Sequence, residues 1–156
     1  EYVRLTQELD ARDTPVVLVL FGDHKPWMGN GGSVYEEMGI DFDTSTLAGF
    51  RNYYATPYLI WANRAAKEVL GADFTGDGGD FSPCFLMTRL FDACGWAGPG
   101  YMQLSRAMRD ISPLLHTNGL FLHDGVLTSV LSDTDRSFYR SWLAVQYYRE
   151  HVAAYS

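Results

Sequence analysis

The sequence predicts an α/β fold in which a small, mostly parallel sheet is flanked by helices. A continuous apolar run at residues 15–21 contains three valines and is too short for a typical helix, so it indicates a strand buried on both faces. A second apolar run, at residues 56–62, has the same character. Segments with helical spacing of apolar residues, bounded by capping residues or glycines, complete the pattern.

Composition is typical of a single globular domain. The chain has 156 residues, of which 47% are hydrophobic and 20% are charged, and this balance argues against a disordered chain. The formal charge of −7 argues against non-specific nucleic-acid binding, which needs a cationic face. No stretch approaches the roughly eighteen consecutive apolar residues of a membrane span, and the first residues lack the pattern of a signal peptide.

The first half of the chain alternates between the two strands and polar connections. Residues 2–12 predict an amphipathic helix, and residues 13–15 form the turn into the first strand. The segment 27–53 is rich in glycine and is expected to be irregular, with a short helix near residues 33–38. A helical turn at residues 63–70 is expected to end at Gly71.

The second half of the chain is predominantly helical. Ser82 as N-cap and Pro83 at the first helical position predict a helix that ends at Gly95. A second helix is expected at residues 101–111 and a hairpin or turn at 119–125. A long helix at residues 135–152 is expected to be capped by Asp133 or Asp135, and it has too many aromatic residues for one face: Phe138, Tyr139, Trp142, Tyr147 and Tyr148. Some of them are expected to pack on the sheet and others to contact a part of the protein outside this chain.

The two cysteines do not indicate a disulfide framework. Cys84 and Cys94 fall in or beside one predicted helix, where ten residues correspond to about 15 Å of rise. That separation is too large for a disulfide, so both are expected to be buried apolar residues.

The segment 72–80 carries three aspartates among glycines. The EF-hand pattern of alternate acidic positions with a distant glutamate is missing. A solvated loop is therefore the favoured interpretation, with a calcium site as the less favoured alternative.

The most informative residues follow the first strand. Asp23 and His24 stand side by side at its carboxyl end, where ligand sites of open α/β sheets gather. Carboxylate and imidazole groups both bind Mn²⁺ or Zn²⁺, and Gly22 leaves room for a metal or phosphate near the backbone. The structural alternative is an Asp–His hydrogen bond at a strand end, and the pair by itself leaves both interpretations open.

Three blocks of the chain resemble one enzyme family. Residues 15–26 are similar to the strand followed by Gly-Asp-His in lipoteichoic acid synthase-like and related phosphoglycerol transferase proteins, in the sulfatase branch of the alkaline phosphatase superfamily. Residues 54–63 resemble the family's Thr-Pro strand that ends in Trp-x-Asn, and residues 82–95 resemble a helix of that family. The order and spacing of the blocks match over most of residues 1–125, although only the Gly-Asp-His block is specific.

The resemblance implies a metal site that this chain supplies in part. In the family the Asp and His of that block are metal ligands, which here are Asp23 and His24, and the metal is commonly manganese. The family's threonine nucleophile and its acidic ligand match no segment of this chain. We therefore expect residues 1–156 to be the carboxyl-terminal part of a sulfatase-like catalytic domain, with its nucleophile upstream and no turnover by this chain alone.

The activity that the resemblance implies is phosphoglycerol transfer. A metal-activated threonine would attack the phosphodiester of an anionic glycerophospholipid such as phosphatidylglycerol, and diacylglycerol would leave. The glycerophosphate would then pass to a cell-envelope polymer or a glycan. The family acts at the extracellular face of the cell membrane, where upstream helices anchor it.

Lys25 and a second His-Asp pair are further candidates. Lys25 follows His24 and is expected to balance phosphate charge, with an exposed loop lysine as the alternative. His123 and Asp124 are also neighbours, but no long buried strand precedes them. We expect this pair to lie in a surface turn, with a substrate contact as the less favoured interpretation.

Two other functions remain open from the sequence. One is a sulfatase or phosphodiesterase of the same fold, which would release its product to water. The other is a non-catalytic module for cell-envelope binding. Retention of both Asp23 and His24 argues mildly against a degenerate, non-catalytic protein.

Overall fold

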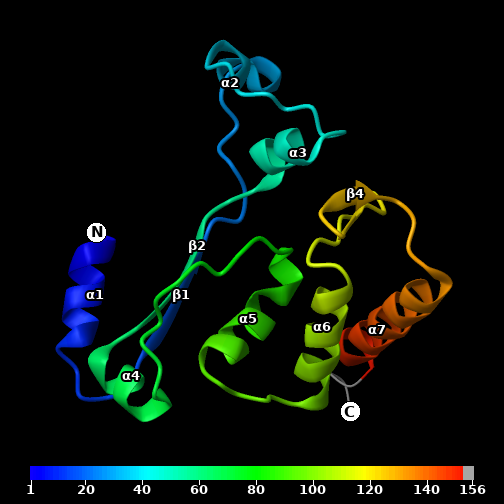
Figure 1. Ribbon diagram of the computed structural model, residues 1–156. Helices are drawn as coiled ribbons and strands as arrows, with labels where there is room; N and C mark the ends of the chain where they lie inside the picture. The colour runs from blue at the N-terminus through cyan, green and yellow to red at the C-terminus, as the bar shows by residue number, and fades with distance from the viewer. Residues whose placement is uncertain (153–156) are drawn as a thin grey trace. The chain divides into compact units, whose positions relative to one another are not determined.

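The computed structural model describes residues 1–152, which divide into two compact units, residues 1–74 and the chain from residue 75 onward (Figure 1). Both units combine helices with a small two-stranded sheet, so the expected mixture of helix and strand is confirmed. Within the described residues, no helix combines the length and apolarity needed to cross a membrane.

The sheet of the first unit is antiparallel. β1 (Val17–Phe21) pairs with β2 (Tyr58–Ala62), with Val17 opposite Ala62 and Phe21 opposite Tyr58. The prediction of a mostly parallel sheet is therefore wrong for the described strands. An apolar run reports how much of a strand can be buried and carries no information on strand direction, which here depends on how the chain returns from β1 to β2.

The long connection between the two strands contains helices of its own. It contains η1 (Asn30–Gly32), α2 (Ser33–Glu37) and α3 (Leu47–Tyr54). The short helix near residues 33–38 is confirmed, but α3 was not predicted in the segment 27–53. Thr46 caps α3 by accepting a hydrogen bond from Gly49 N, and this internal glycine conceals the helix in the sequence.

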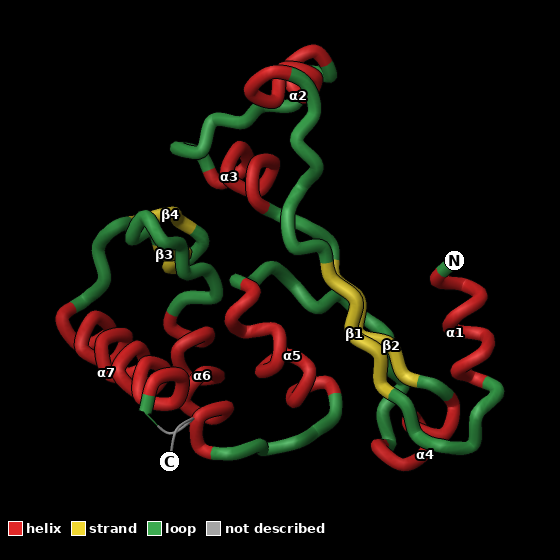
Figure 2. The backbone as a smooth tube through the Cα atoms, turned by 180° about the vertical axis from the view of Figure 1, so that it is seen from behind, coloured by secondary structure: helices red, strands yellow, loops and turns green. Residues whose placement is uncertain are grey.

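The two paired strands β1 and β2 form a ribbon, and Asn63 lies at the end of it where β2 finishes. Figures 1 and 2 both show α1 (Tyr2–Asp10) and α4 (Arg64–Leu70) at this end. The Oδ1 atom of Asn63 accepts from Ala66 N as the N-cap of α4 and from Val16 N at the start of β1. Its Nδ2 lies 2.9 to 3.2 Å from the carbonyl oxygens of Leu9, Arg12 and Thr14. The expected end of α4 at Gly71 is also found.

The ribbon is less buried than predicted. The residues of β1 before Phe21 are half-buried, Phe21 itself is 60% exposed, and Leu59 of β2 is 48% exposed. The apolar side of α1 is also uncovered, since that helix has no buried residue and Val3 is 70% exposed. A two-stranded ribbon has too little surface to cover both of its own faces.

The second unit is a helical cluster around one aromatic core. Phe85, Met108 and Trp142 are at most 3% exposed. The partly buried apolar residues packed against them come from two helices and the connecting segments: Phe81, Leu104, Ile111, Leu115, Phe138 and Tyr139. The elements lie as follows: η2 (Pro83–Phe85), α5 (Leu86–Ala93), α6 (Gly100–Ile111), β3 (Phe121–His123), β4 (Val126–Thr128) and α7 (Asp133–His151).

The aromatic residues of α7 divide between core and surface, as their number predicted. Trp142 is buried, Phe138 and Tyr139 pack against the core, and Tyr147 and Tyr148 are 62% and 55% exposed. The buried residues contact helices and the β3–β4 hairpin, because this unit contains no larger sheet within its described residues.

Capping in the second unit differs from the prediction at two helices. Ser82 precedes the short η2 turn, and its hydroxyl bonds the backbone of Leu115 instead of capping the helix. α7 begins at Asp133 and its cap is Ser132, which accepts from Asp135 N at 3.1 Å. Several polar residues near the start of this helix can act as its cap. Which of them does so depends on the residue at which the backbone becomes helical.

The cysteines are both free, which agrees with the prediction of no disulfide. Cys94 is buried at 3% exposure, as expected. Cys84 is exposed, so its assignment as a buried residue was wrong. It lies in the η2 turn instead of on the inner face of a regular helix.

Candidate metal-binding pair

Asp23 and His24 lie where the chain leaves the β1–β2 ribbon. The ladder extends one residue beyond β1, since Gly22 N donates to Pro57 O at 3.0 Å. The chain then turns away toward α2 (Figure 1). The side chains of Asp23 and His24 are 80% and 78% exposed, so both are accessible to a ligand from solvent.

The local backbone orients both side chains. Asp23 Oδ1 accepts a hydrogen bond from His24 N at 2.8 Å. His24 Nδ1 lies 3.0 Å from the carbonyl oxygen of Lys25. A carbonyl oxygen can only accept, so Nδ1 carries the proton of this hydrogen bond, and the tautomer with its proton on Nδ1 has its lone pair on Nε2.

That lone pair faces a second electron-pair donor. Nε2 of His24 and Oδ2 of Asp23 are 3.6 Å apart. Two ligands about 2.1 Å from a metal are about 3.4 Å apart in tetrahedral coordination and about 3.0 Å apart in octahedral coordination, which manganese prefers. These two atoms therefore lie slightly farther apart than neighbouring ligands, within a small side-chain rotation of that spacing. A cation between them, either a proton on Nε2 or a metal ion, relieves the repulsion of the two donors. The carbonyl partner on Nδ1 is the arrangement that orients metal-binding histidines in proteins.

The pair offers two ligands and no more. Across residues 1–152, no group of three or more His, Cys, Asp or Glu side chains is arranged to hold a metal ion. Two protein ligands leave most of a metal's coordination sphere to water or to groups outside the described residues. The geometry therefore fits part of a metal site.

Lys25 does not reach into solvent beside the pair. Its Nζ donates to the carbonyl oxygen of Asn52 at the end of α3 and lies 6.0 Å from the centre of the Phe42 ring. An ammonium group has three donors, so two remain for an anion. The phosphate contact stays a prediction, and the observed contacts anchor the loop.

Gly22 serves a different purpose from the one expected. A Cβ at this position would lie 3.0 Å from the Cβ of Thr56. Thr56 also donates from Oγ1 to Gly22 O at 2.6 Å. The missing side chain thus admits Thr56 against the backbone, and sequence reasoning missed this residue. The Thr-Pro pair before β2 was the only sign of it.

The second His-Asp pair has a different arrangement. His123 Nδ1 lies 3.2 Å from Asp124 Oδ2, and its Nε2 lies 3.7 Å from Oδ2 of Asp135 on α7. Each ring nitrogen therefore faces its own carboxylate, so the three side chains do not converge on one point. The predicted turn is confirmed, because Asp124 and Gly125 form the tip of the β3–β4 hairpin.

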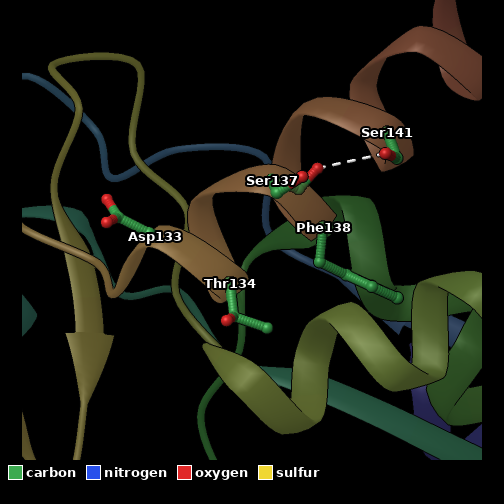
Figure 3. A pocket seen from close by; sticks show the side chains of 5 residues that line it. All are labelled: Asp133, Thr134, Ser137, Phe138 and Ser141. Atoms are coloured by element: carbon green, nitrogen blue, oxygen red, sulfur yellow. Dashed lines mark hydrogen bonds between the residues drawn. The ribbon is translucent and has the colours of Figure 1, made fainter.

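An open hollow on the surface of α7 is lined by Asp133, Thr134, Ser137, Phe138 and Ser141. Figure 3 shows these side chains along the first turns of the helix. The Ser141 hydroxyl donates to the Ser137 carbonyl oxygen at 3.0 Å, so it is engaged by its own helix. Asp133 is the one titratable side chain in the lining and no histidine is part of it, so we assign the hollow no chemistry.

In the loop at residues 72–80, Asp77 Oδ1 accepts from Gly79 N at 2.8 Å, which is a local turn contact. The calcium alternative therefore gains no support from this contact.

Comparison with known proteins gives no relative: no family model, curated protein or solved structure matches the chain.

Proposed function

We propose that this chain contributes the Asp-His half of the metal site of a sulfatase-like phosphoglycerol transferase. The observation that carries the proposal is the 3.6 Å separation of His24 Nε2 and Asp23 Oδ2, while His24 Nδ1 lies 3.0 Å from the Lys25 carbonyl oxygen. The Gly-Asp-His, Thr-Pro and Ser-Pro blocks supply the family resemblance.

In this proposal the remaining metal ligands and the threonine nucleophile come from a segment outside the chain. The uncovered faces of β1 and β2 support a further covering segment, since Phe21 and Leu59 are 60% and 48% exposed. An antiparallel pair at the edge of an otherwise parallel sheet is common among large α/β sheets. The ribbon is therefore compatible with a sulfatase-like fold.

The roles of this chain's residues follow from their positions. Asp23 and His24 hold a divalent cation, for which manganese is our choice. The cation stabilises the negative charge of the transition state of phosphoryl transfer. Lys25 stands next to the pair with two donors left for a phosphate oxygen. The substrate is an anionic glycerophospholipid at the outer face of the cell membrane, and the acceptor is a cell-envelope polymer or a glycan.

Manganese titration of the chain tests the metal site. Paramagnetic Mn²⁺ broadens nearby nuclei, so the imidazole signals of the chain's four histidines report which ring binds it. We expect His24 to broaden first, with weak affinity because only two ligands are present. Asp23→Ala should remove the preference for His24.

Asp124→Ala is the matched control, because Asp124 also lies beside a histidine, with Oδ2 3.2 Å from His123 Nδ1. This variant should leave the broadening of His24 unchanged. Equal broadening of all histidines in the unmodified chain would show that the metal has no preference for His24 and would overturn the metal site. Nanomolar affinity or turnover by residues 1–156 alone would contradict the proposal that ligands are supplied from outside.

Substrate turnover tests the reaction in a protein that includes the preceding segment. We expect diacylglycerol release from phosphatidylglycerol with Mn²⁺, measured by mass spectrometry, and its loss in Asp23→Ala. Activity on an aryl sulfate instead would move the protein to the sulfatases, and water as the only acceptor would indicate a phosphodiesterase. Absence of turnover on all of these substrates would favour the alternative of a non-catalytic binding module.

A further inference from the structure

The backbone immediately before Asp23 is fixed by two consecutive residues of the returning chain. Thr56 Oγ1 donates to the carbonyl oxygen of Gly22 at 2.6 Å. The next residue, Pro57, accepts from Gly22 N at 3.0 Å through its own carbonyl oxygen. Both polar groups of Gly22 are therefore held, and the peptide plane that leads into Asp23 cannot rotate without breaking the Thr56 hydrogen bond.

Close packing reinforces this hydrogen bond. A Cβ on Gly22 would lie 3.0 Å from Thr56 Cβ and 3.5 Å from its Cγ2. Gly22 does not have a positive φ, so its backbone conformation is open to other residues. The requirement for glycine comes from the approach of Thr56, which the structure makes a specific partner of this position.

A second anchor lies on the other side of the pair. Lys25 Nζ donates to the Asn52 carbonyl oxygen, and Tyr35 donates from its hydroxyl to Pro26 O at 2.6 Å. Asp23 and His24 thus stand between a fixed Gly22 and a fixed Lys25–Pro26. Their own polar contacts are with each other and with adjacent backbone.

We infer that Thr56 is a positioning residue for the metal-binding pair. This inference rests on the proposed function and adds the residue that holds the ligands in place. Exposed side chains have rotational freedom, and a site with two protein ligands loses affinity when that freedom grows. By fixing the Gly22 carbonyl, Thr56 fixes the direction in which the Asp23 side chain leaves the backbone, and hence its distance to His24 Nε2.

The test compares Thr56→Val, which keeps the shape of the side chain and removes its donor, with Thr56→Ser, which keeps the hydroxyl. The measured quantity is the Mn²⁺ concentration that half-broadens the His24 ring signals. Removal of an outer-shell partner typically weakens metal binding about 10- to 100-fold. We expect about a tenfold loss for Thr56→Val and recovery in Thr56→Ser.

Thr6→Val is the matched control, because Thr6 donates to carbonyl oxygens of its own helix, Tyr2 O and Val3 O, both at 3.1 Å. It removes the same donor at a distance in sequence from the pair and should leave Mn²⁺ affinity unchanged. Urea unfolding of each variant defines conditions in which all are folded, so that lost stability is not mistaken for lost affinity.

The outcomes separate this inference from the proposed function. Preferential binding at His24 with equal affinity in Thr56→Val overturns the positioning role and leaves the metal site standing. Absence of preferential binding in the unmodified chain overturns the metal site and the positioning role with it. Should Thr56→Val fail to fold, Gly22→Ala displaces Thr56 from the same contact, and unchanged Mn²⁺ affinity in that variant overturns the inference.

Discussion

Asn63 Oδ1 accepts a hydrogen bond from Val16 N at 2.9 Å, although 47 residues separate the two along the chain. The same oxygen caps α4 by accepting from Ala66 N at 2.9 Å. Asn63 is fully buried, and its amide nitrogen lies within hydrogen-bonding distance of three carbonyl oxygens before β1. One side chain thus defines where β1 begins, where α4 begins and how α1 joins them.

Asn63→Ala should therefore destabilise the first unit strongly. It removes a helix cap and leaves buried backbone groups without partners, which together cost about 3 kcal/mol or more. The measurement is urea unfolding followed through the amide signals of β1 and β2. Asn118→Ala, at an exposed turn position, is the control and should change the midpoint little. A stable Asn63→Ala protein would show that the register of β1 is set by other contacts.

Asp92 should make the second unit sensitive to acid. Burial favours the neutral carboxyl, but hydrogen bonds and charge from Arg109 and Arg106, both 2.6 Å away, outweigh this effect and hold the pKa of Asp92 below its usual value. A carboxylate whose pKa is lowered in the folded state adds stability at pH values above its unfolded pKa of about 3.9. That stability is lost as the pH falls through the lower, folded-state pKa.

Asp92→Asn should cost about 1.5–3 kcal/mol at neutral pH, the range for hydrogen bonds to charged groups, and should flatten the acid limb of the stability curve. The measurement is urea unfolding of α5 and α6 signals between pH 2.5 and 7. Asp110→Asn is the matched control, since Asp110 is 68% exposed and 3.7 Å from Arg109. An equal effect in both variants would contradict a special role for Asp92.

Ser105 should contribute to the core of the second unit through one hydrogen bond. Its buried hydroxyl accepts from Trp142 Nε1 at 3.0 Å. Ser105→Ala leaves the indole N–H without this partner at a cost of about 1–3 kcal/mol. Thermal unfolding in the near-ultraviolet circular dichroism of the aromatic residues measures the change. The exposed Ser137→Ala should be neutral, and a neutral Ser105→Ala would indicate that the indole finds another partner.

Gly125 should be required by backbone conformation alone. Asp124 and Gly125 have φ values of 48° and 78°, as in the tight turns of two-residue hairpins, and an added Cβ on Gly125 would meet nothing within 4 Å. Gly125→Ala should cost about 1–2 kcal/mol, the strain of a left-handed alanine. The protection of the β3 and β4 amides against hydrogen exchange reports this loss.

Gly100 supplies the control for that prediction. It also has open space around an added Cβ, but it lies at the start of α6 without a positive φ. Gly100→Ala should be neutral or slightly stabilising, because alanine is the better helix former. A similar loss of stability in both variants would show that backbone strain does not cause the effect of Gly125→Ala.

Local chemistry was the part of this protein that the sequence could predict. The helix stop at Gly71 was found where the pattern indicated. The aromatic residues of α7 do divide between core and surface, although the sequence did not say which of them are buried. Errors arose where several residues compete for one role. The cap of α7 is Ser132, where the neighbouring aspartates were predicted. A second source of error was a helix breaker inside a helix, since Gly49 concealed α3.

The candidate site divides in the same way. Asp23 and His24 are adjacent in the sequence at the end of an apolar run, so their juxtaposition required no knowledge of the fold. The role of Thr56 did not follow from the sequence, because its contact with Gly22 depends on a return of the chain across 34 residues. Lys25, expected beside a substrate, is anchored to Asn52 by the same return.

By itself the sequence determined β1, β2, most helices and the Asp23–His24 pair, because each follows from side-chain periodicity, capping or adjacency within a few residues. The tertiary structure decided that β1 and β2 run antiparallel, that Thr56 packs on Gly22, and that His24 Nε2 faces Asp23 with Nδ1 already bonded. Strand direction and long-range contacts depend on the path of the connecting chain, which local patterns do not encode.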